Sequence, residues 1–215
     1  MKPPPFKYAR PGELDEVLAL LSEHGDEAKL LAGGQSLIPL LNFRLARPSV
    51  LVDLNSVSGL DGMTSQNGTI GLGAMVRQRA AERSPDVGSS CPLIVQALRH
   101  VAHLQIRNRG TVGGSIAHAD PAAELPAVAL ALDAEMVVRS AAGERVVPAS
   151  EFFQGPFTTA VGPEEVLVEV RFPKLAGARS TFLELARRSG DFALAGVAAV
   201  ARVEEGSGAV TEARL

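Results

Sequence analysis

The chain has 215 residues, 46% of them hydrophobic, so it is long and apolar enough to bury a substantial core. Its formal net charge is -3 and its longest basic cluster is Arg107-Asn108-Arg109, which argues against a nucleic-acid partner. No apolar run approaches the roughly 20 residues of a membrane-spanning helix, and the first five residues lack the apolar segment of a signal peptide. We expect a cytoplasmic protein with no membrane span.

The few cysteines and histidines limit metal and redox chemistry. The single cysteine, Cys91, excludes an internal disulfide, a CxxC pair and iron–sulfur ligation by this chain. Beside Pro92 and an apolar run, it is predicted to be a small buried residue. His100 and His103 have i, i+3 spacing, but no third ligand stands in helical register with them. We therefore expect no metal site.

The first half of the chain alternates helical and strand patterns. Apolar residues at helical spacing predict a helix within residues 11–24 that ends at Gly25. Ser36 is placed to cap the helix that follows it. The Ser, Gly, Asp and Asn content of residues 55–67 predicts a subdomain boundary. Further strands are predicted at 28–31, 49–54 and 69–73, and further helices at 37–44, 75–83 and 92–104.

The second half contains a helix followed by strands. Residues 121–132 predict a helix buried on most sides, and residues 135–139 and 144–148 flank a hairpin turn. Alternation predicts strands at 165–172 and 180–186, whereas residues 193–203 fit either a strand or a helix. The chain then stops within what resembles a developing α+β unit, so we expect a fragment or a missing C-terminal part.

Two glycine pairs are the most informative motifs: Ala32-Gly33-Gly34-Gln35-Ser36 and Thr111-Val112-Gly113-Gly114-Ser115. A diglycine permits positive φ and close approach to a ligand, and the N–H groups of such a turn can bind an anion. Two converging loops would suit a pyrophosphate, and therefore a dinucleotide. The alternative is two ordinary tight turns.

The stretch from Gln105 through the second motif to Pro121 resembles the FAD-binding medium subunit of molybdenum hydroxylases, the group with aerobic carbon monoxide dehydrogenase and the xanthine dehydrogenases. The first motif stands where that family has its other FAD loop, and residues 152–167 are also similar. The resemblance implies an α+β, two-subdomain FAD-binding fold of the vanillyl-alcohol oxidase (PCMH) type. It places subdomains at 1–55 and 56–175, and a truncated C-terminal α+β domain at 176–215.

The resemblance also implies site residues. Residues Lys29, Leu30, Leu31, Ala32, Gly33, Gly34, Gln35 and Ser36 would wrap the FAD pyrophosphate, and Thr111, Val112, Gly113, Gly114 and Ser115 would complete the cradle. Val101, Glu124 and Val161 would contact other parts of FAD, and Arg187 or Arg188 would replace a family lysine missing at Leu185. Gln35 departs from the family's His or Thr, which bears on flavin tuning. No covalent tether is evident, so FAD would be noncovalent.

The implied function is electron transfer from [2Fe-2S] clusters through FAD to an external acceptor, with the redox chemistry carried by the cofactor. Molybdopterin and the clusters would lie on a large and a small partner subunit, in a dimer of heterotrimers, and no catalytic residue is assigned here. Asp120 and His118 are interpreted as structural. Two alternatives stay open: a scaffold subunit with weak or no flavin binding, and a stand-alone flavin oxidase. A nicotinamide-binding Rossmann protein is disfavoured because neither motif is GxGxxG.

Overall fold

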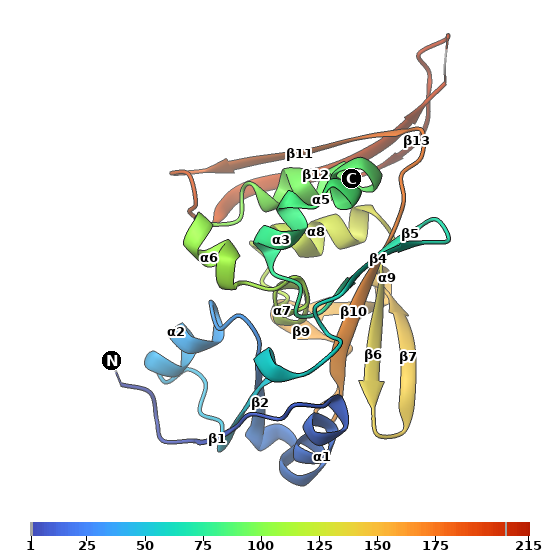
Figure 1. Cartoon of the computed structure of the whole chain (residues 1–215). Coiled ribbons are helices and arrows are strands. Elements are labelled where there is room, and N and C mark those ends of the chain that lie inside the picture. The colour runs from blue at the N-terminus through green and yellow to red at the C-terminus, as the bar shows by residue number, and fades with distance from the viewer. Residues whose placement is uncertain (1, 205) are drawn as a thin grey trace.

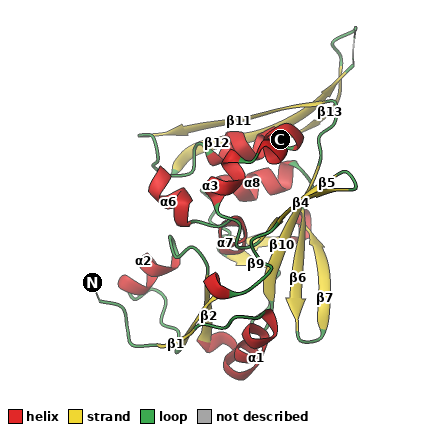
Figure 2. Ribbon diagram, in the orientation of Figure 1, coloured by secondary structure: helices red, strands yellow, loops and turns green. Residues whose placement is uncertain are grey.

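The computed structural model describes residues 2–204 and 206–215, which form three larger sheets and a two-stranded one, with helices around them (Figure 1). A parallel sheet of order β1-β3-β2 is followed by a five-stranded sheet of order β4-β5-β10-β6-β7 and an antiparallel sheet of order β11-β12-β13. Figure 2 shows most helices gathered between the second and third sheets. Within the described residues, no helix combines the length and apolar composition needed to cross a bilayer.

The first region contains the N-terminal strands and two α-helices. Its elements are β1 (Lys7–Ala9), α1 (Leu14–His24), η1 (Gly25–Glu27), β2 (Ala28–Leu31), α2 (Leu37–Asn42), β3 (Val50–Asp53) and η2 (Leu54–Ser56). Helix α1 buries Val17, Leu18 and Leu21, and its predicted end at Gly25 is confirmed by a φ of 50° there. The predicted cap at Ser36 is wrong, because the Ser36 side chain makes no capping hydrogen bond to α2.

The five-stranded sheet confirms the four strands that alternation and turn chemistry predicted within it. Its strands are β4 (Met63–Gln66), β5 (Thr69–Gly73), β6 (Glu135–Ser140), β7 (Gly143–Pro148) and β10 (Val166–Pro173), and β8 (Phe153–Gly155) and β9 (Thr158–Thr159) form a separate pair. The β6–β7 hairpin turns where predicted, and β10 pairs with both β5 and β6. Strand β4 was not predicted, because its exposed residues, Met63 and three polar residues after it, lack an apolar alternation.

The helical layer corrects several predictions. Its helices are α3 (Gln78–Arg83), α4 (Pro85–Ser90), α5 (Pro92–Leu98), α6 (Leu104–Arg109), α7 (Val112–His118), α8 (Glu124–Ala131) and α9 (Ala149–Phe152). The helix predicted at 92–104 ends at Leu98, and Ala102 has a positive φ of 36°. Residues 105–115, interpreted as a loop, instead belong largely to α6 and the start of α7.

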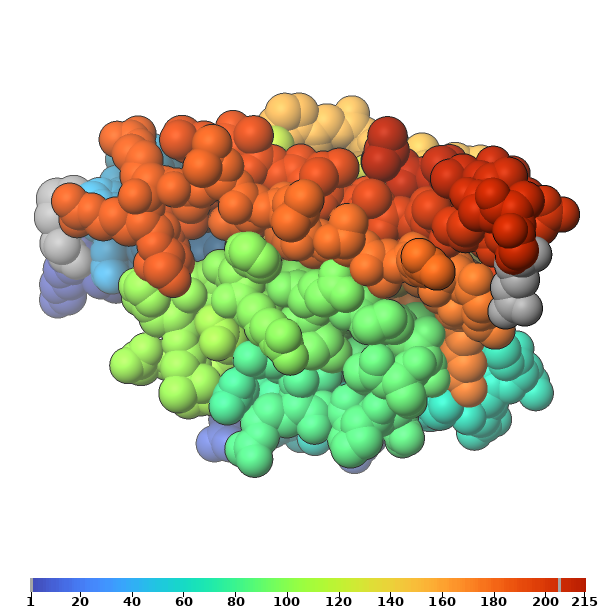
Figure 3. Space-filling view, turned by 90° about the horizontal axis from the view of Figure 1, so that it is seen from above, coloured from blue at the N-terminus to red at the C-terminus, as the bar shows by residue number. Residues whose placement is uncertain are grey.

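The third sheet resolves the ambiguous segment 193–203 as a strand. It consists of β11 (Ala178–Ala186), β12 (Ala193–Val203) and β13 (Val210–Arg214). Phe182, Ala198 and Val200 are buried in the same core cluster as residues of α5 and α8. Seen from above, these strands form an orange-to-red band beside the green segment around residues 80–110 (Figure 3). The third sheet therefore shares the core of the helical layer, and the domain division at 55 and 175 stays a prediction.

Candidate functional site

A cavity of about 470 Å³ opens beside the first glycine motif, a size within the usual range of small-molecule sites. It is lined by residues 31–35, by Ile38 and Pro39 of α2, by Asp53 and Asn55, and by Ile106 and Arg109 of α6. Its wall therefore combines the first glycine motif with the helix that precedes the second. The segment that leads into the second motif therefore lies against the first motif, whereas residues 111–115 do not line the cavity.

The loop after β2 depends on both of its glycines. Gly34 has φ +74°, a conformation that side chains disfavour. A Cβ atom on Gly33 would overlap the Arg109 carbonyl oxygen and lie 2.8 Å from Gly110 Cα. The Gln35 side-chain amide donates to the Gly33 carbonyl at 2.9 Å and braces the loop. Gly33 is therefore required because the two backbone segments touch, and Gly34 because the chain turns.

The backbone N–H groups of this loop are open. Those of residues 33–36 donate to no acceptor in the part of the chain that the structure describes. The carbonyls of Gly34 and Ser36, by contrast, accept from Ile38 and Leu40. A run of free N–H groups in a tight loop is an anion-binding arrangement, and residues 33–35 of this run line the cavity. These free donors give a physical basis to the prediction that the first glycine motif binds a phosphate group.

Two arginines lie at this site. Arg109 lines the cavity, and Arg77 donates from Nη1 to the Arg109 carbonyl at 2.5 Å. Burial, and next the positive charge of Arg109, lower the pKa of Arg77. Two guanidinium groups close enough to repel one another would be stabilised by an anion between or beside them. Charge and backbone donors therefore favour the same class of ligand.

The second glycine motif has a different structure from the predicted loop. Thr111 caps α7, with its hydroxyl accepting from the Gly114 N–H at 3.0 Å. The N–H groups of Val112 and Gly113 donate to the carbonyls of Val76 and Ala74, at 2.9 and 3.0 Å. Since these donors are used within the fold, they are not free for an anion. The prediction that this motif offers a second open loop is wrong.

The second motif instead serves close packing. A Cβ on Gly113 would lie 2.5 Å from Ala74 Cα, so α7 approaches the end of β5 more closely than any side chain would allow. A Cβ on Gly114 would lie 3.4 Å from the Ala32 Cβ of the first loop. The start of α7 is therefore a wall next to the first loop.

The other predicted residues lie outside the cavity lining. Lys29 and Leu30 belong to β2, and Ser36 is exposed at the start of α2. Half-buried Val161 packs against the main core. Arg187 is exposed in the turn after β11. In the same turn, a Cβ on Gly190 would lie 2.6 Å from His103 Nδ1, so this turn folds back over the segment before α6.

Val101 and Glu124 share one neighbour, Arg107. The Arg107 guanidinium donates to the Val101 carbonyl at 2.7 Å and pairs with Glu82 at 3.0 Å. Burial raises the pKa of Glu124 to about 7, helped by the negative charges of Glu184 and Asp120, while Arg107 opposes the shift. Glu124 is therefore protonated for part of the time near neutral pH.

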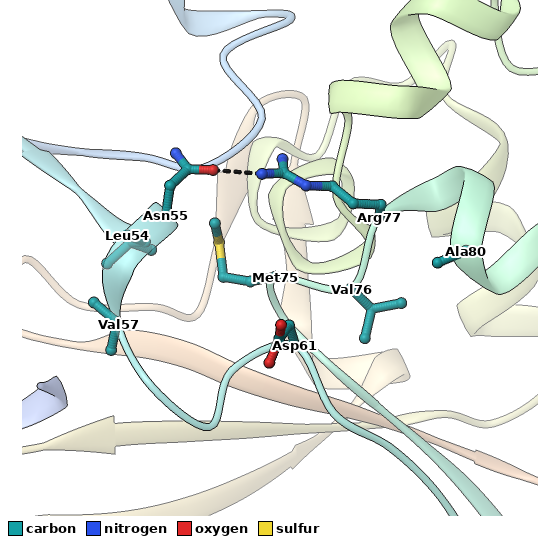
Figure 4. A pocket seen from close by; sticks show the side chains of 8 residues that line it. All are labelled: Leu54, Asn55, Val57, Asp61, Met75, Val76, Arg77 and Ala80. Carbon is teal, nitrogen blue, oxygen red and sulfur yellow. Dashed lines mark hydrogen bonds between the residues drawn. The ribbon is translucent and has the colours of Figure 1, made fainter. Parts of the chain in front are cut away.

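Four residues of a hydrogen-bonded network around the cavity were not predicted: Tyr8, Asp53, Asn55 and Arg77. Asn55 and Arg77 also line a second pocket of about 180 Å³, where Figure 4 shows them joined across its edge. Asn55 was interpreted only as part of a polar boundary. Residues 22 positions apart carry no periodic signal that could have paired them.

Cys91 is confirmed as a small buried residue. It is fully buried, and its thiol donates to the Pro173 carbonyl at 3.3 Å. Burial raises its pKa to about 11, which keeps it protonated and unreactive. Among the described residues, no group of three potential metal-ligating side chains is found.

Comparisons with known proteins identify the family of this chain. Residues 4–175 match the family described as FAD binding domain in molybdopterin dehydrogenase. The whole chain is 45% identical to the alpha subunit of the 6-hydroxypseudooxynicotine dehydrogenase complex of Paenarthrobacter nicotinovorans, and it spans 73% of that subunit.

Solved structures show the same fold. The chain matches a carbon monoxide dehydrogenase chain of Hydrogenophaga pseudoflava with a TM-score of 0.96 and 41% identity, covering 100% of this chain and 74% of the other. It matches a chain of quinoline 2-oxidoreductase of Pseudomonas putida 86 with a TM-score of 0.95 and 44% identity, at the same coverage. The chain therefore belongs to the family of FAD-binding domains of molybdopterin dehydrogenases, and it is an FAD-binding oxidoreductase subunit of the molybdenum hydroxylase type.

Proposed function

We propose that this chain transfers electrons from [2Fe-2S] clusters through FAD to an external acceptor. The observation that carries the proposal is the loop at 33–36, whose N–H groups are free and which has Arg77 and Arg109 nearby. These groups fit the pyrophosphate of a dinucleotide. FAD, held noncovalently, supplies the redox chemistry when bound. The chain's own task is to bind and orient it.

Different parts of the chain have different tasks in this proposal. The first loop donates hydrogen bonds to phosphate oxygens, and Arg109 supplies a positive charge. Residues 111–115 close the site from the adjacent side through helix packing. Val101, Glu124, Val161 and Arg187 contact the remainder of the cofactor, as the family resemblance implies. Glu124, with its pKa of about 7, can present a protonated carboxyl to a polar edge.

The partners in this proposal are a large molybdopterin subunit and a small iron–sulfur subunit, arranged as a dimer of heterotrimers. Support comes from the relatives, whose names describe a complex subunit and a medium chain. A chain with one cysteine, buried and protonated, has no thiolate set for a cluster. The relatives' names refer to different substrates, such as 6-hydroxypseudooxynicotine, quinoline and carbon monoxide. Substrate choice is therefore assigned to the large partner.

The first test is to incubate the purified chain with FAD, desalt it and record the visible flavin absorption. We expect the native chain to retain the flavin absorption after desalting. We also expect Gly33→Val to lose the flavin, because the valine side chain would push the loop away from Arg109. The affinity for FAD should fall about tenfold or more. Gly155→Val is the matched control, because a Cβ there meets nothing within 4 Å.

The alternatives give different results. Absence of flavin binding, even with both partner subunits present, would leave the scaffold interpretation in place. Substrate turnover by the isolated chain would favour a stand-alone oxidase. Electron transfer itself is tested in the assembled complex, where adding substrate should bleach the flavin absorption in the native protein and not in the Gly33→Val complex.

A further inference from the structure

Asn55 uses its whole side-chain amide to hold the first glycine loop. Its Nδ2 group donates to the Ala32 carbonyl at 3.0 Å and to Asp53 Oδ1 at 2.5 Å. Its Oδ1 atom accepts from Arg77 Nη2 at 2.5 Å. Three partners from three segments of the chain thus use both of its N–H donors and its oxygen. A side chain in this position fixes the backbone of the loop and the guanidinium of Arg77 at the same time.

Arg77 makes the matching connection to the second glycine motif. Its Nη1 atom donates to the Arg109 carbonyl, the same carbonyl that a Cβ on Gly33 would overlap. The backbone around Arg77 is tied to the same segment, because Gln78 N donates to Gly110 O and Val112 N donates to Val76 O, both at 2.9 Å. Arg77 therefore stands between the loop of the first region and the α6–α7 junction of the helical layer.

We propose that Asn55 and Arg77 are positioning residues that set the separation between residues 32–36 and residues 109–111, and with it the width of the dinucleotide site. This inference rests on the proposed function for the identity of the ligand. The first motif follows β2 of the parallel sheet, and the second packs against the end of β5 in the five-stranded sheet. The Asn55–Arg77 hydrogen bond crosses between these two regions (Figure 4). Neither residue needs to touch the cofactor for this role.

The outer end of the connection is anchored in the parallel sheet. The Tyr8 hydroxyl donates to Asp53 Oδ2 at 2.5 Å, and Asp53 is 8% exposed at the end of β3. Burial opposes ionisation of Asp53, but hydrogen bonds from Tyr8 and Asn55 outweigh it and lower its pKa. The order Tyr8, Asp53, Asn55, Arg77 thus links β1 and β3 to α3. An ionised Asp53 holds the Asn55 amide in the orientation that Arg77 requires.

The first test uses the FAD-free chain and measures hydrogen exchange at single amides. In Asn55→Ala we expect about tenfold faster exchange at the backbone amides of Gln78 and Val112, which donate across the junction between the Arg77 segment and residues 110–112. In Arg77→Met we expect a similar increase at the amide of Asn55, which donates to Asp53 at 2.9 Å. Unchanged exchange at these remote amides in both variants would overturn the inference.

The second test measures FAD affinity by quenching of flavin fluorescence. We expect Asn55→Ala and Arg77→Met each to weaken binding about ten- to a hundredfold, the usual effect of losing a charge-assisted hydrogen bond. The double variant should lose no more FAD affinity than the weaker-binding of the two single variants, because the pair acts as one unit. Arg77→Lys keeps the charge and one donor direction, so it should recover part of the affinity.

Arg145→Met is the matched control. Like Arg77, Arg145 donates from its guanidinium to a backbone carbonyl, that of Ala160 at 2.6 Å, and to a second side chain, here Glu165. Arg145 lies on the five-stranded sheet, away from the first glycine loop. Its FAD affinity should equal that of the native chain. Additive losses in the double variant would mean that Arg77 acts on the ligand directly, which would overturn the positioning role. If the native chain binds no FAD even with both partner subunits present, the proposed function fails, while hydrogen exchange still decides the inference.

Discussion

The first glycine loop and the start of α7 share a Gly-Gly pair with a serine after it, but they differ in whether their backbone N–H groups are hydrogen-bonded. In the loop at 33–36 the N–H groups have no acceptor in the described structure. At the start of α7 the corresponding groups donate to Val76, Ala74 and Thr111. One glycine pair keeps a ligand surface open, and the other permits a helix to touch a strand end. The comparison teaches that anion binding depends on where the N–H groups go, and not on the dipeptide itself.

The largest effect is expected from Gly113→Val, because its side chain would overlap Ala74 where α7 meets β5. We expect a loss of about 3 kcal/mol in the free energy of unfolding, typical of severe overpacking. Urea unfolding of the native chain and the variant measures it, with Gly155→Val as the control in open space. A native-like midpoint would contradict the packing role of the second motif.

The helical layer should also show a pH dependence through Glu124, at the first position of α8. Its folded pKa is raised to about 7, so the folded state holds the proton more tightly than the unfolded state. Stability should therefore be full below the unfolded pKa, near 4.5, and fall as pH rises to about 7. We expect a fall of at most about 3 kcal/mol. Glu124→Gln should flatten this profile, and an unchanged slope would refute the assignment.

A smaller effect is expected from Thr111→Ala, which removes the cap of α7. The loss should be about 1–2 kcal/mol of unfolding free energy, and Thr111→Ser should recover most of it because the hydroxyl remains. Thermal unfolding of the three proteins measures this. Equal stability of Thr111→Ala and the native chain would show that the Gly114 N–H finds another acceptor.

The smallest effect is expected from Ser36→Ala, which changes the N-cap position of α2 at the end of the first motif. Since the Ser36 side chain makes no capping hydrogen bond, stability should change by less than about 0.5 kcal/mol. The same unfolding measurement applies, paired with FAD affinity. A loss as large as that of Thr111→Ala would mean that the two motifs are structurally alike after all.

Much of the framework was predictable because local patterns determine it. The β6–β7 hairpin, β5, β10 and the glycine end of α1 follow from alternation, turn residues and capping chemistry. Residues 105–115 were mispredicted because their glycines and polar residues suggest a loop. Packing of Gly113 on Ala74 and the Thr111 cap make the region helical instead. Strand β12 was ambiguous because small apolar residues fit both patterns, and pairing with β11 decided it.

The sequence by itself determined the family resemblance and the positions of most helices and strands, and it predicted a cofactor site at the two glycine motifs. Only the tertiary structure decided which motif has free donors, because that depends on whether carbonyls such as those of Ala74 and Val76 lie within hydrogen-bonding distance. It likewise joined Asn55 to Arg77, whose contact depends on the packing of two separate regions. Local chemistry selects the elements, whereas the satisfaction of polar groups is settled only when distant segments are brought together.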